Sequence, residues 1–209
     1  MKYTGPKLKL CRREVINLFG TEKYDLSKSH RKPLGSSKMA KMSDYSLQLR
    51  KKQAAKRMYF LTEKQFYSYY KKALKMSGVL GENMMRLLES RLDNVIFKSN
   101  FARTIMQARQ FVNHAHFLVN GKKVNIPSFL LKVGDEIELK EKMKESSIYK
   151  ALVEEFKEFI NKNKKANLAF VKWIEVDPDK LKIKIISLPG KDDFDQTIDI
   201  QKIIEFYSK

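Results

Sequence analysis

Four polar side chains recur at helical spacing between residues 103 and 114. Arg103, Gln107, Gln110 and His114 follow one another at intervals of four, three and four positions, so a helix would place them on one face. A guanidinium binds phosphate, and amide or imidazole groups form hydrogen bonds with sugar hydroxyls and base edges. Apolar residues occupy the complementary positions 105, 108, 111, 112 and 115. The stripe therefore predicts non-covalent recognition of a polyanion.

A tight hairpin follows this helix. Asn120-Gly121 separates the apolar run 117–119 from Lys122 and Lys123. Asn-Gly between such runs is the strongest short hairpin signal, because both turn residues need positive φ. The turn would present two lysines beside the polar stripe.

A first short helix must support this segment. Leu92, Val95 and Ile96 have helical spacing and predict it just before the stripe. From residue 81 to 132 the only acids are Glu82, Glu89 and Asp93. Residue types and spacing thus predict a compact helix–helix–hairpin surface suited to a polyanion.

Charged residues are distributed unevenly along the chain. The 209 residues carry a net charge of +19, with 28 basic and 8 acidic residues in 1–134 but 15 and 16 in 135–209. Such a one-sided segment predicts a phosphate-rich partner. An anionic membrane is the alternative, but the basic segments lack an amphipathic helix with an exposed aromatic face. There is no run of 18 apolar residues and no secretory signal at the start.

Several short motifs, in this order, resemble one family. RLDN at 91–94, ARQFVNHAH at 108–116, VNGKKVNIPSF at 119–129 and VGDEI at 133–137 resemble the RNA-binding module of bacterial small-subunit ribosomal protein S-four. The resemblance extends from GPKLKLCRRE at 5–14, through SDYSLQLRKKQ at 43–53, to IEFYSK at the carboxyl end. It covers nearly the whole chain.

The resemblance implies a structural constituent of the small subunit of the bacterial, cytoplasmic ribosome. It implies primary binding of small-subunit ribosomal RNA at a multi-helix junction, a role in nucleating assembly, and a contribution to translational accuracy. It also implies a place at the pore through which messenger RNA enters, beside small-subunit proteins three and five. A-form RNA hides its major-groove edges, so such a protein reads shape and backbone.

Residue roles follow from the charges, the spacing and the resemblance together. Asp93 and Asn94 are expected to brace the module, and Arg109 could brace the fold as well as bind. Lys38 and Lys41 lie roughly where the family offers cations to messenger RNA. The side chains expected to contact RNA are Lys7, Lys9, Arg12, Arg13, Arg50, Lys51, Lys52, Lys56, Arg57, Arg91, Arg103, Gln107, Arg109, Gln110, His114, Asn120, Lys122 and Lys123.

The sequence departs from the family pattern within the second helix. Relatives usually carry one or two arginines where Ile105 and Met106 stand, and Arg103 could compensate from one turn earlier. The usual glycine between the two histidines is Ala115, so we expect a wider or mildly strained turn there.

Residues 1–42 predict a mostly extended basic arm with a short helix near 12–19; a disordered tail is the alternative. Many relatives bind zinc through four cysteines in this arm. Cys11 is the only cysteine of the chain, Leu8 occupies another ligand position, and one thiolate with His30 makes no tetrahedral site. We expect no zinc, no other cofactor and no intrachain disulfide.

The next helix is expected to begin at Ser43 and to end near residue 60. It carries five cations within eight residues and no interleaved acid: Arg50, Lys51, Lys52, Lys56 and Arg57. Like charges at this spacing destabilise a helix, so we expect phosphates to neutralise them; a solvated face is the alternative.

A capping box, Thr62 with Gln65, predicts a helix over 63–76. We expect its apolar face to belong to the core rather than to stack on bases. That face comprises Phe66, Tyr69, Tyr70, Ala73 and Leu74, and a helix after Gly81 would pack on it.

The last third predicts strands at 129–131 and 137–139, then a charged helix over 141–165 with an apolar stripe at 148, 152, 156, 159 and 160. Residues 169–176 and 180–186 predict a hairpin. In its second strand Lys180, Lys182 and Lys184 share the solvent face. Trp173 is expected in the core, and 200–207 predicts a closing helix.

No catalytic pattern accompanies these elements. The three histidines are scattered, and there is no phosphate loop and no nucleophile–base order. The acids at 192, 193 and 195 are expected to form a solvated loop rather than a metal site. We predict a non-enzymatic protein with no membrane or small-molecule partner. The alternatives are a free-standing RNA-modifying or remodelling factor and a nonspecific polyanion binder.

The predicted fold class is α+β: a helical N-terminal domain, and an RNA-binding module of two short helices and a small antiparallel sheet, closed by a C-terminal hairpin and helix. The predicted division is an arm at 1–42, a helical domain at 43–90, the RNA-binding module at 91–150, and residues 151–209 completing both domains.

Overall fold

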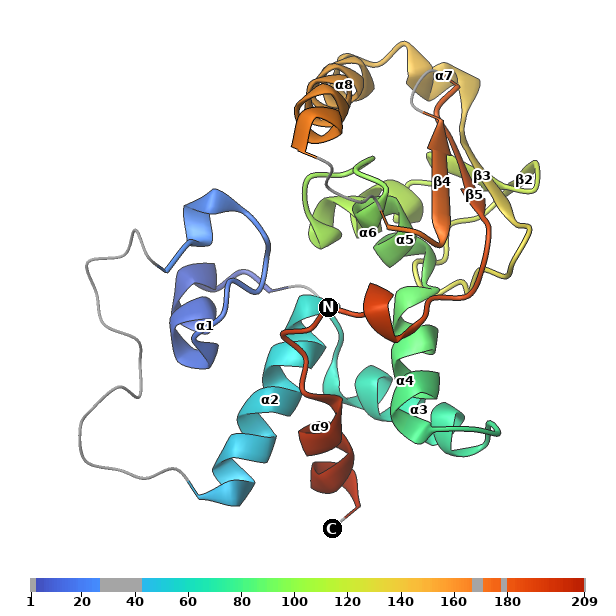
Figure 1. The fold of residues 1–209 in the computed structure, drawn as a ribbon. Coiled ribbons are helices and arrows are strands. Elements are labelled where there is room, and N and C mark those ends of the chain that lie inside the picture. The colour runs from blue at the N-terminus through green and yellow to red at the C-terminus, as the bar shows by residue number, and fades with distance from the viewer. Residues whose placement is uncertain (1–2, 27–42, 167–170, 178–179, 209) are drawn as a thin grey trace. The chain divides into compact units, whose positions relative to one another are not determined.

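The computed structural model describes residues 3–26, 43–166, 171–177 and 180–208 (Figure 1). The chain forms two compact units, residues 86–193 and residues 1–85 together with 194–209. Helices and one antiparallel sheet confirm the predicted α+β class. The four-part division predicted from the sequence remains a proposal.

The unit that contains both termini is helical. Its elements are α1 (Lys7–Glu14), a 3₁₀ turn (Glu22–Tyr24), α2 (Asp44–Met58), α3 (Glu63–Leu74), the start of α4 (Leu80–Glu89) and α9 (Ile200–Tyr207). The Ser43 hydroxyl accepts a hydrogen bond from the Ser46 amide, and Thr62 and Gln65 form both bonds of the capping box. The predicted starts of α2 and α3 are confirmed.

Two predictions about this unit are wrong. The first helix lies at Lys7–Glu14 rather than near 12–19, because Val15 adopts a left-handed φ of 58° and ends it; Leu18 and Phe19 beyond the turn are buried. In α3 the aromatic face is buried as expected, but Leu74 is exposed because the helix ends there.

The other unit is built around a five-stranded antiparallel sheet in the order β2-β1-β3-β5-β4. The strands are β1 (Phe117–Val119), β2 (Lys122–Lys123), β3 (Glu136–Leu139), β4 (Ile174–Asp177) and β5 (Lys182–Ile185). The helical elements are α5 (Leu92–Lys98), α6 (Ile105–Asn113), α7 (Glu141–Lys144), α8 (Ser147–Ala166) and a 3₁₀ turn (Lys191–Asp193). Figure 1 shows α5 and α6 beside β4 and β5.

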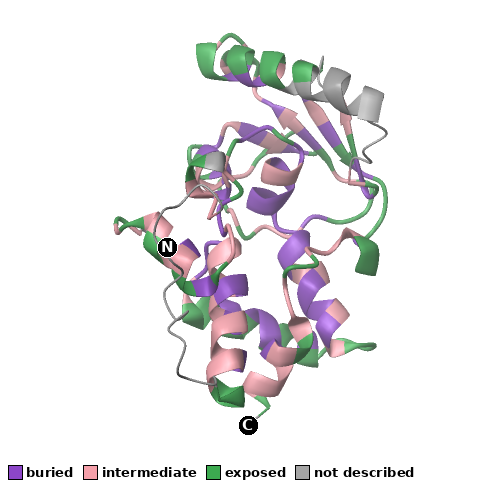
Figure 2. Ribbon diagram, turned by 60° about the vertical axis from the view of Figure 1, so that its left-hand side comes forward, coloured by how far each residue is buried: buried purple, intermediate pink, exposed green. Residues whose placement is uncertain are grey.

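One continuous apolar core joins these elements. It combines the inner side chains of the sheet with the apolar faces of α5 and α6. Trp173 is buried in this core, as predicted. Figure 2 shows the buried residues gathered on the inner sides of helices and strands, and exposed residues at turns and along α8. The core thus fixes α5, α6 and the β1–β2 hairpin as one rigid support.

The last third departs from prediction in three places. Residues 129–131 form only an isolated bridge, Leu130 with Arg91, because the ladder of β3 is already taken by β1 and β5. The 141–165 helix is broken after Lys144. At the start of α8, Tyr149 is buried and Ile148 is exposed. The predicted side chains at 156, 159 and 160, the start of the 169–176 strand and the turn at 178–179 lie outside the described residues.

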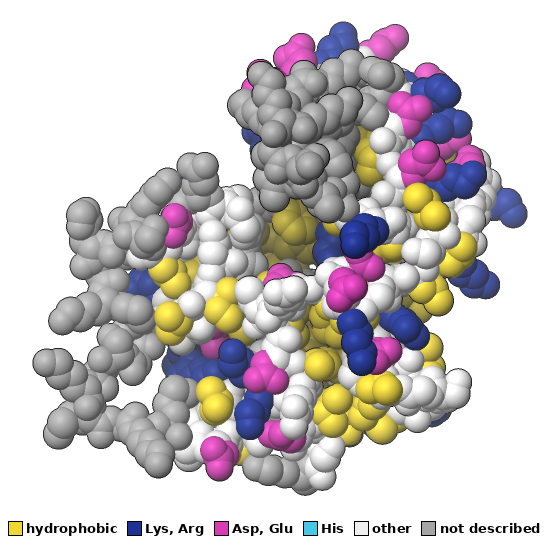
Figure 3. All heavy atoms as spheres, viewed as in Figure 1, with side chains coloured by type: hydrophobic (Ala, Val, Ile, Leu, Met, Phe, Trp, Pro, Cys, Tyr) yellow, Lys and Arg dark blue, Asp and Glu magenta, His cyan; other side chains and the backbone are white. Residues whose placement is uncertain are grey.

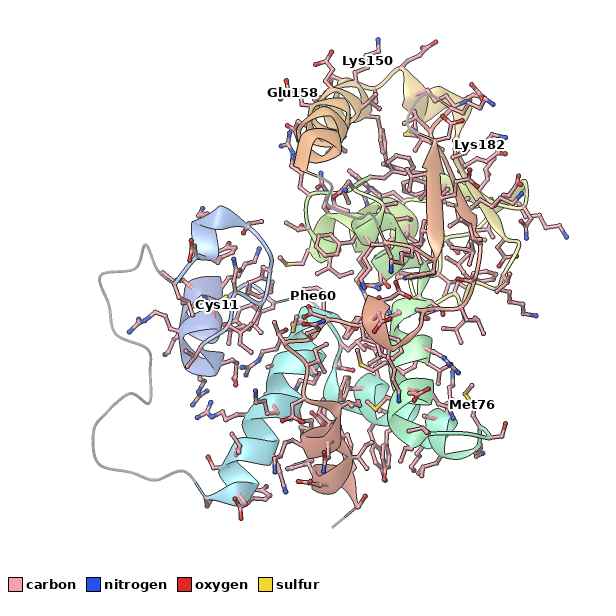
Figure 4. All side chains as sticks on the ribbon, viewed as in Figure 1. Cys11, Phe60, Met76, Lys150, Glu158 and Lys182 are labelled. Atoms are coloured by element: carbon pink, nitrogen blue, oxygen red, sulfur yellow. The ribbon has the colours of Figure 1, made fainter. Side chains whose placement is uncertain are left out.

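The outer face of the sheet carries paired charges. Glu136 lies opposite Lys184 and Glu138 opposite Lys182 between β3 and β5. Their charged atoms are 3.5 Å and 2.5 Å apart, respectively. The predicted solvent face of the strand is confirmed, and Figure 4 shows Lys182 on it. We call Glu136, Glu138, Lys182 and Lys184 the sheet ladder.

Candidate nucleic-acid interface

A buried carboxylate, Asp93, holds α5 and α6 together. Arg91 binds it through two hydrogen bonds, Nε to Oδ1 at 2.9 Å and Nη2 to Oδ2 at 2.6 Å, and Nη1 of Arg109 lies 3.4 Å from Oδ2. Burial raises the pKa of Asp93, and the two guanidiniums oppose that rise. Asp93 therefore braces the fold, as expected. Arg91, which we expected to contact RNA, is itself buried and serves the same purpose.

A second buried acid, Glu89, anchors the carboxyl end of α5. Lys98 Nζ lies 2.6 Å from its Oε2, and Asn94 Nδ2 donates to the same oxygen at 2.7 Å. Every residue from 86 to 134 is described, and Glu89 and Asp93 are the only acids among them. Because both are fully buried, this segment exposes cations and no acid.

The start of α6 is capped by side chains. The Thr104 hydroxyl accepts a hydrogen bond from the Gln107 amide at 3.2 Å. The Gln107 side chain accepts one from the Arg103 amide at 2.8 Å, so its oxygen is engaged within the protein. The Arg103 side chain forms a two-pronged ion pair with Glu155 of α8. The sequence analysis missed this partner, since 52 positions separate the two residues.

The rest of the predicted polar stripe faces outward. Gln110 and His114 are exposed, and Gln107 is half-buried. Asn113 is also exposed. It follows Gln110 by three positions, and this helical spacing could have identified it as a member of the polar stripe. We define the basic surface as seven exposed side chains between residues 103 and 132: Arg103, Gln110, Asn113, His114, Lys122, Lys123 and Lys132.

The carboxyl end of α6 turns sharply toward β1. Ala115 has a φ of 53°, and its amide donates to the Val112 carbonyl at 2.8 Å while the His116 amide donates to Phe111 at 3.0 Å. These two bonds define a Schellman end, which usually places glycine at the left-handed position. The mild strain expected at Ala115 is thus visible as a left-handed alanine.

His116 ties this turn to α8. Its ring stacks on Phe111 at a centroid distance of 5.2 Å, and its Nδ1 lies 2.8 Å from the Tyr149 hydroxyl. Burial lowers the pKa of His116, and the neighbouring His114 and Lys140 lower it further. The neutral ring can therefore accept the hydrogen bond of the tyrosine.

The β1–β2 hairpin is confirmed, with φ of 49° at Asn120 and 73° at Gly121. Lys122 and Lys123 are exposed. The amide of Asn120 instead binds inward: Nδ2 donates to Asp135 Oδ1 at 2.8 Å, and Oδ1 accepts from the Glu136 amide at 2.9 Å. Asn120 fastens the hairpin to the next turn rather than offering its amide to a ligand. In Figure 3, lysine and arginine side chains project at the right-hand edge, where Figure 1 places this hairpin.

Four of the five cations noted in α2 form ion pairs within the protein. The carboxylate of Glu63 binds Lys52 at 2.7 Å and Lys56 at 3.2 Å, and Lys52 is buried against the Phe206 ring. The buried Glu14 of α1 pairs in the same way, with Arg57 and, at 3.6 Å, with Arg50. These cations thus have partners within the protein, and their contact with phosphates stays a prediction. Both glutamates lie outside α2: Glu63 is 7 positions from Lys56, and Glu14 is 43 positions from Arg57.

The other residues predicted to contact RNA lie on α1 and α2 or outside the described residues. Lys9 and Arg13 of α1 are exposed, whereas Lys7, Arg12 and Lys51 are half-buried. Lys38 and Lys41 lie outside the described residues. The surface available for binding in this unit is therefore smaller than the count of cations suggested.

Within the described residues, no cluster of three or more histidine, cysteine or acidic side chains could hold a metal ion. Cys11 is buried, and burial raises the pKa of its thiol. In the described part of the chain, none of the helices has the length and apolarity needed to cross a bilayer. The cationic surfaces remain the candidate site.

Two family models match consecutive segments in the first two thirds of the chain. Residues 2–89 match the family model of the ribosomal protein S4/S9 N-terminal domain, and residues 90–137 match that of the S4 domain.

Full-length relatives agree. The chain is 44% identical to the small ribosomal subunit protein uS4 of Thermotoga petrophila, 43% to that of Heliobacterium modesticaldum and 45% to that of Caldicellulosiruptor saccharolyticus. Each comparison covers 100% of this chain and 99% of the relative. At this identity over the entire length, the chain belongs to the family of bacterial small ribosomal subunit protein uS4.

Proposed function

We propose that the basic surface binds the phosphates and riboses of folded small-subunit ribosomal RNA. As a member of its family, the chain is a structural, non-enzymatic constituent of the small subunit of the bacterial cytoplasmic ribosome. Binding to small-subunit ribosomal RNA follows from the family and its S4 domain. A free-standing RNA-modifying factor is not favoured. What we propose beyond this is the set of residues that make the contact.

One observation supports this choice of surface: residues 86–134 expose cations and no acid, since Glu89 and Asp93 are buried. Each neutralised phosphate releases counterions, which favours binding and makes it salt-dependent. Lys122 and Lys123 would contact phosphates. Gln110 and His114 would form hydrogen bonds with sugar hydroxyls or base edges.

The rigidity of this surface supports recognition of RNA shape. The buried network around Asp93 fixes α5 against α6, and the amide of Asn120 fixes the hairpin. Side chains on rigid elements match one spatial arrangement of phosphates better than a flexible strand. The proposed target is therefore a multi-helix junction, and its capture would nucleate assembly of the subunit.

The α1 helix, in the other unit, would make RNA contacts of its own. Lys9 and Arg13 are exposed there, and Arg50 retains a partly exposed guanidinium beside Glu14. The contributions to translational accuracy and to the pore for messenger RNA, with proteins three and five as neighbours, rest on the resemblance alone, as does a contact of Lys38 and Lys41 with messenger RNA.

A binding experiment tests the proposal. The full chain is titrated with folded small-subunit ribosomal RNA and with an unstructured RNA of equal length, across a range of salt concentrations. We expect a preference for the folded RNA that persists at elevated salt, and hydroxyl-radical protection confined to one junction. Equal affinity for both RNAs would overturn recognition of shape, and loss of the chain from small subunits in a high-salt wash would argue against a stoichiometric constituent.

A further inference from the structure

The ion pair between Arg103 and Glu155 joins the start of α6 to α8. Nε of Arg103 donates to Oε2 of Glu155 at 2.9 Å, and a second nitrogen binds Oε1. Both planar groups thus meet edge to edge. This two-pronged geometry is also the one in which a guanidinium binds two oxygens of a phosphate.

The pair is exposed, unlike the other ion pairs beneath α5 and α6. The side chains of Arg103 and Glu155 are 58% and 54% accessible, whereas those of Asp93 and Glu89 are completely buried. An exposed pair contributes little to stability, so a competing anion can displace it at small cost. The buried pairs cannot exchange partners in this way.

Arg103 lies at the edge of the basic surface, so loss of its ion pair with Glu155 would add a positive charge there. Arg103 precedes the helix that carries Gln110 and His114, and its backbone amide is held by the Gln107 side chain. Its backbone is therefore fixed on the basic surface, while its guanidinium is occupied. In the free protein Glu155 cancels the charge of the arginine nearest to the start of α6.

We propose that Glu155 acts as an internal stand-in for an RNA phosphate, which takes over the Arg103 guanidinium when ribosomal RNA binds. This inference rests on the proposed function. The carboxylate lowers RNA affinity by competing for Arg103 and, once displaced, by lying close to the incoming phosphate.

The exchange requires no large rearrangement. Tyr149 and Leu152 are buried and anchor the first turns of α8 in the core, so the backbone at Glu155 is held one turn beyond a fixed point. Rotation of the glutamate side chain is sufficient to free the guanidinium. Figure 4 labels Lys150 and Glu158, which bracket this part of α8.

The chain provides a matched control. Glu154 is the exposed neighbour of Glu155, and replacing either glutamate by glutamine removes one negative charge from the same turn of α8. The Arg103 side chain is exposed and lies outside the apolar core, so its replacement should leave the fold intact. Four variants therefore suffice: Glu155→Gln, Glu154→Gln, Arg103→Gln and the double variant Arg103→Gln/Glu155→Gln.

The test measures affinity for folded small-subunit ribosomal RNA as a function of salt, with circular dichroism to check folding. Glu155→Gln should raise affinity about two- to fivefold above Glu154→Gln, the range by which exposed ion pairs shift equilibria. Arg103→Gln should reduce the slope of log K against log salt by about 0.7 to 0.9, the value of one phosphate contact. In the Arg103→Gln background, Glu155→Gln should have no more effect than a generic loss of charge.

Three outcomes would overturn the inference: equal effects of Glu155→Gln and Glu154→Gln, an unchanged slope for Arg103→Gln, or the full gain from Glu155→Gln without Arg103. These outcomes differ from failure of the proposed function, in which the unaltered chain shows no preference for folded ribosomal RNA. A wild-type preference with an unchanged Arg103→Gln slope would retain the interface and remove only this exchange.

Discussion

The basic surface and the sheet ladder lie in the same unit and both present exposed lysines, yet their surroundings differ. Lys122 and Lys123 have no acid opposite them in the hairpin register, whereas Lys182 and Lys184 each face a glutamate across the ladder. Within residues 86–134 the acids are buried; on the ladder Glu136 is exposed and Glu138 half-buried beside their partners. A count of lysines therefore does not identify a binding surface. The location of the acids does.

The largest expected effect concerns the acid under the basic surface. Asp93→Ala should lower the free energy of unfolding by about 3–5 kcal/mol, because it leaves the buried Arg91 without its partner. Glu136→Ala on the sheet ladder should cost at most about 1 kcal/mol, because that pair is exposed. Urea unfolding measures both. Similar losses in the free energy of unfolding would mean that the acids of the two regions contribute equally to stability.

The next prediction compares the lysines of the two regions. Lys122→Ala with Lys123→Ala should weaken binding to folded ribosomal RNA and reduce the log–log salt slope by about 1.4 to 1.8, since two phosphate contacts are lost. Lys182→Ala with Lys184→Ala removes the same charge from the sheet ladder and should leave the slope unchanged. Filter binding across a salt series distinguishes them. If both pairs lower the slope equally, the RNA does not discriminate between the two faces.

A smaller effect is expected at two residues with a left-handed backbone, Ala115 at the end of α6 and Gly134 before β3. Ala115→Gly should raise the free energy of unfolding by about 1 kcal/mol, because glycine removes the steric cost of positive φ at the end of α6. Gly134→Ala, in the turn before β3 where φ is 90°, should lower it by a similar amount, although the added methyl group meets no atom within 4 Å. Thermal unfolding provides the readout, and no stabilisation by Ala115→Gly would contradict the assignment of strain.

The smallest effect concerns pH. The folded pKa of His116 lies below its ordinary value of 6.5, so the unfolded chain binds the proton more readily. Stability should be full above about pH 6.5 and fall as pH decreases through 6.5 toward the folded pKa. His116→Phe, which keeps a ring beside Phe111, should flatten this dependence between pH 7 and 5.5. An unchanged pH slope in that variant would show that another group is responsible.

Local signals in the sequence predicted local structure well. The Ser43 cap, the Thr62–Gln65 box and the Asn120-Gly121 turn are each set by neighbouring residues, and all three are confirmed. The family resemblance predicted the fold class and the strain at Ala115.

What the sequence could not provide is the partner of a charged residue. Glu14 and Glu63 pair with cations of α2 from outside that helix, and Glu155 reaches Arg103 across 52 positions. Such pairs depend on how elements pack, which no spacing pattern encodes. For this reason the sequence did not reveal that cations of α2 already have partners within the protein.

The sheet ladder also disfavours one shifted alignment of β3 with β5. The alternating Lys-Ile pattern of β5 would keep its apolar side inward after a slip of two residues, so burial alone cannot forbid that shift. If Lys182 moves by two positions toward the carboxyl end of β3, it would face Lys140, and Glu136 would face Ile186. Both observed ion pairs would be rearranged or lost, and two like charges would be brought together. The charges that take no part in the proposed RNA contact thus oppose this slip, whereas the opposite slip would keep opposite charges together, Lys182 with Glu136 and Lys180 with Glu138.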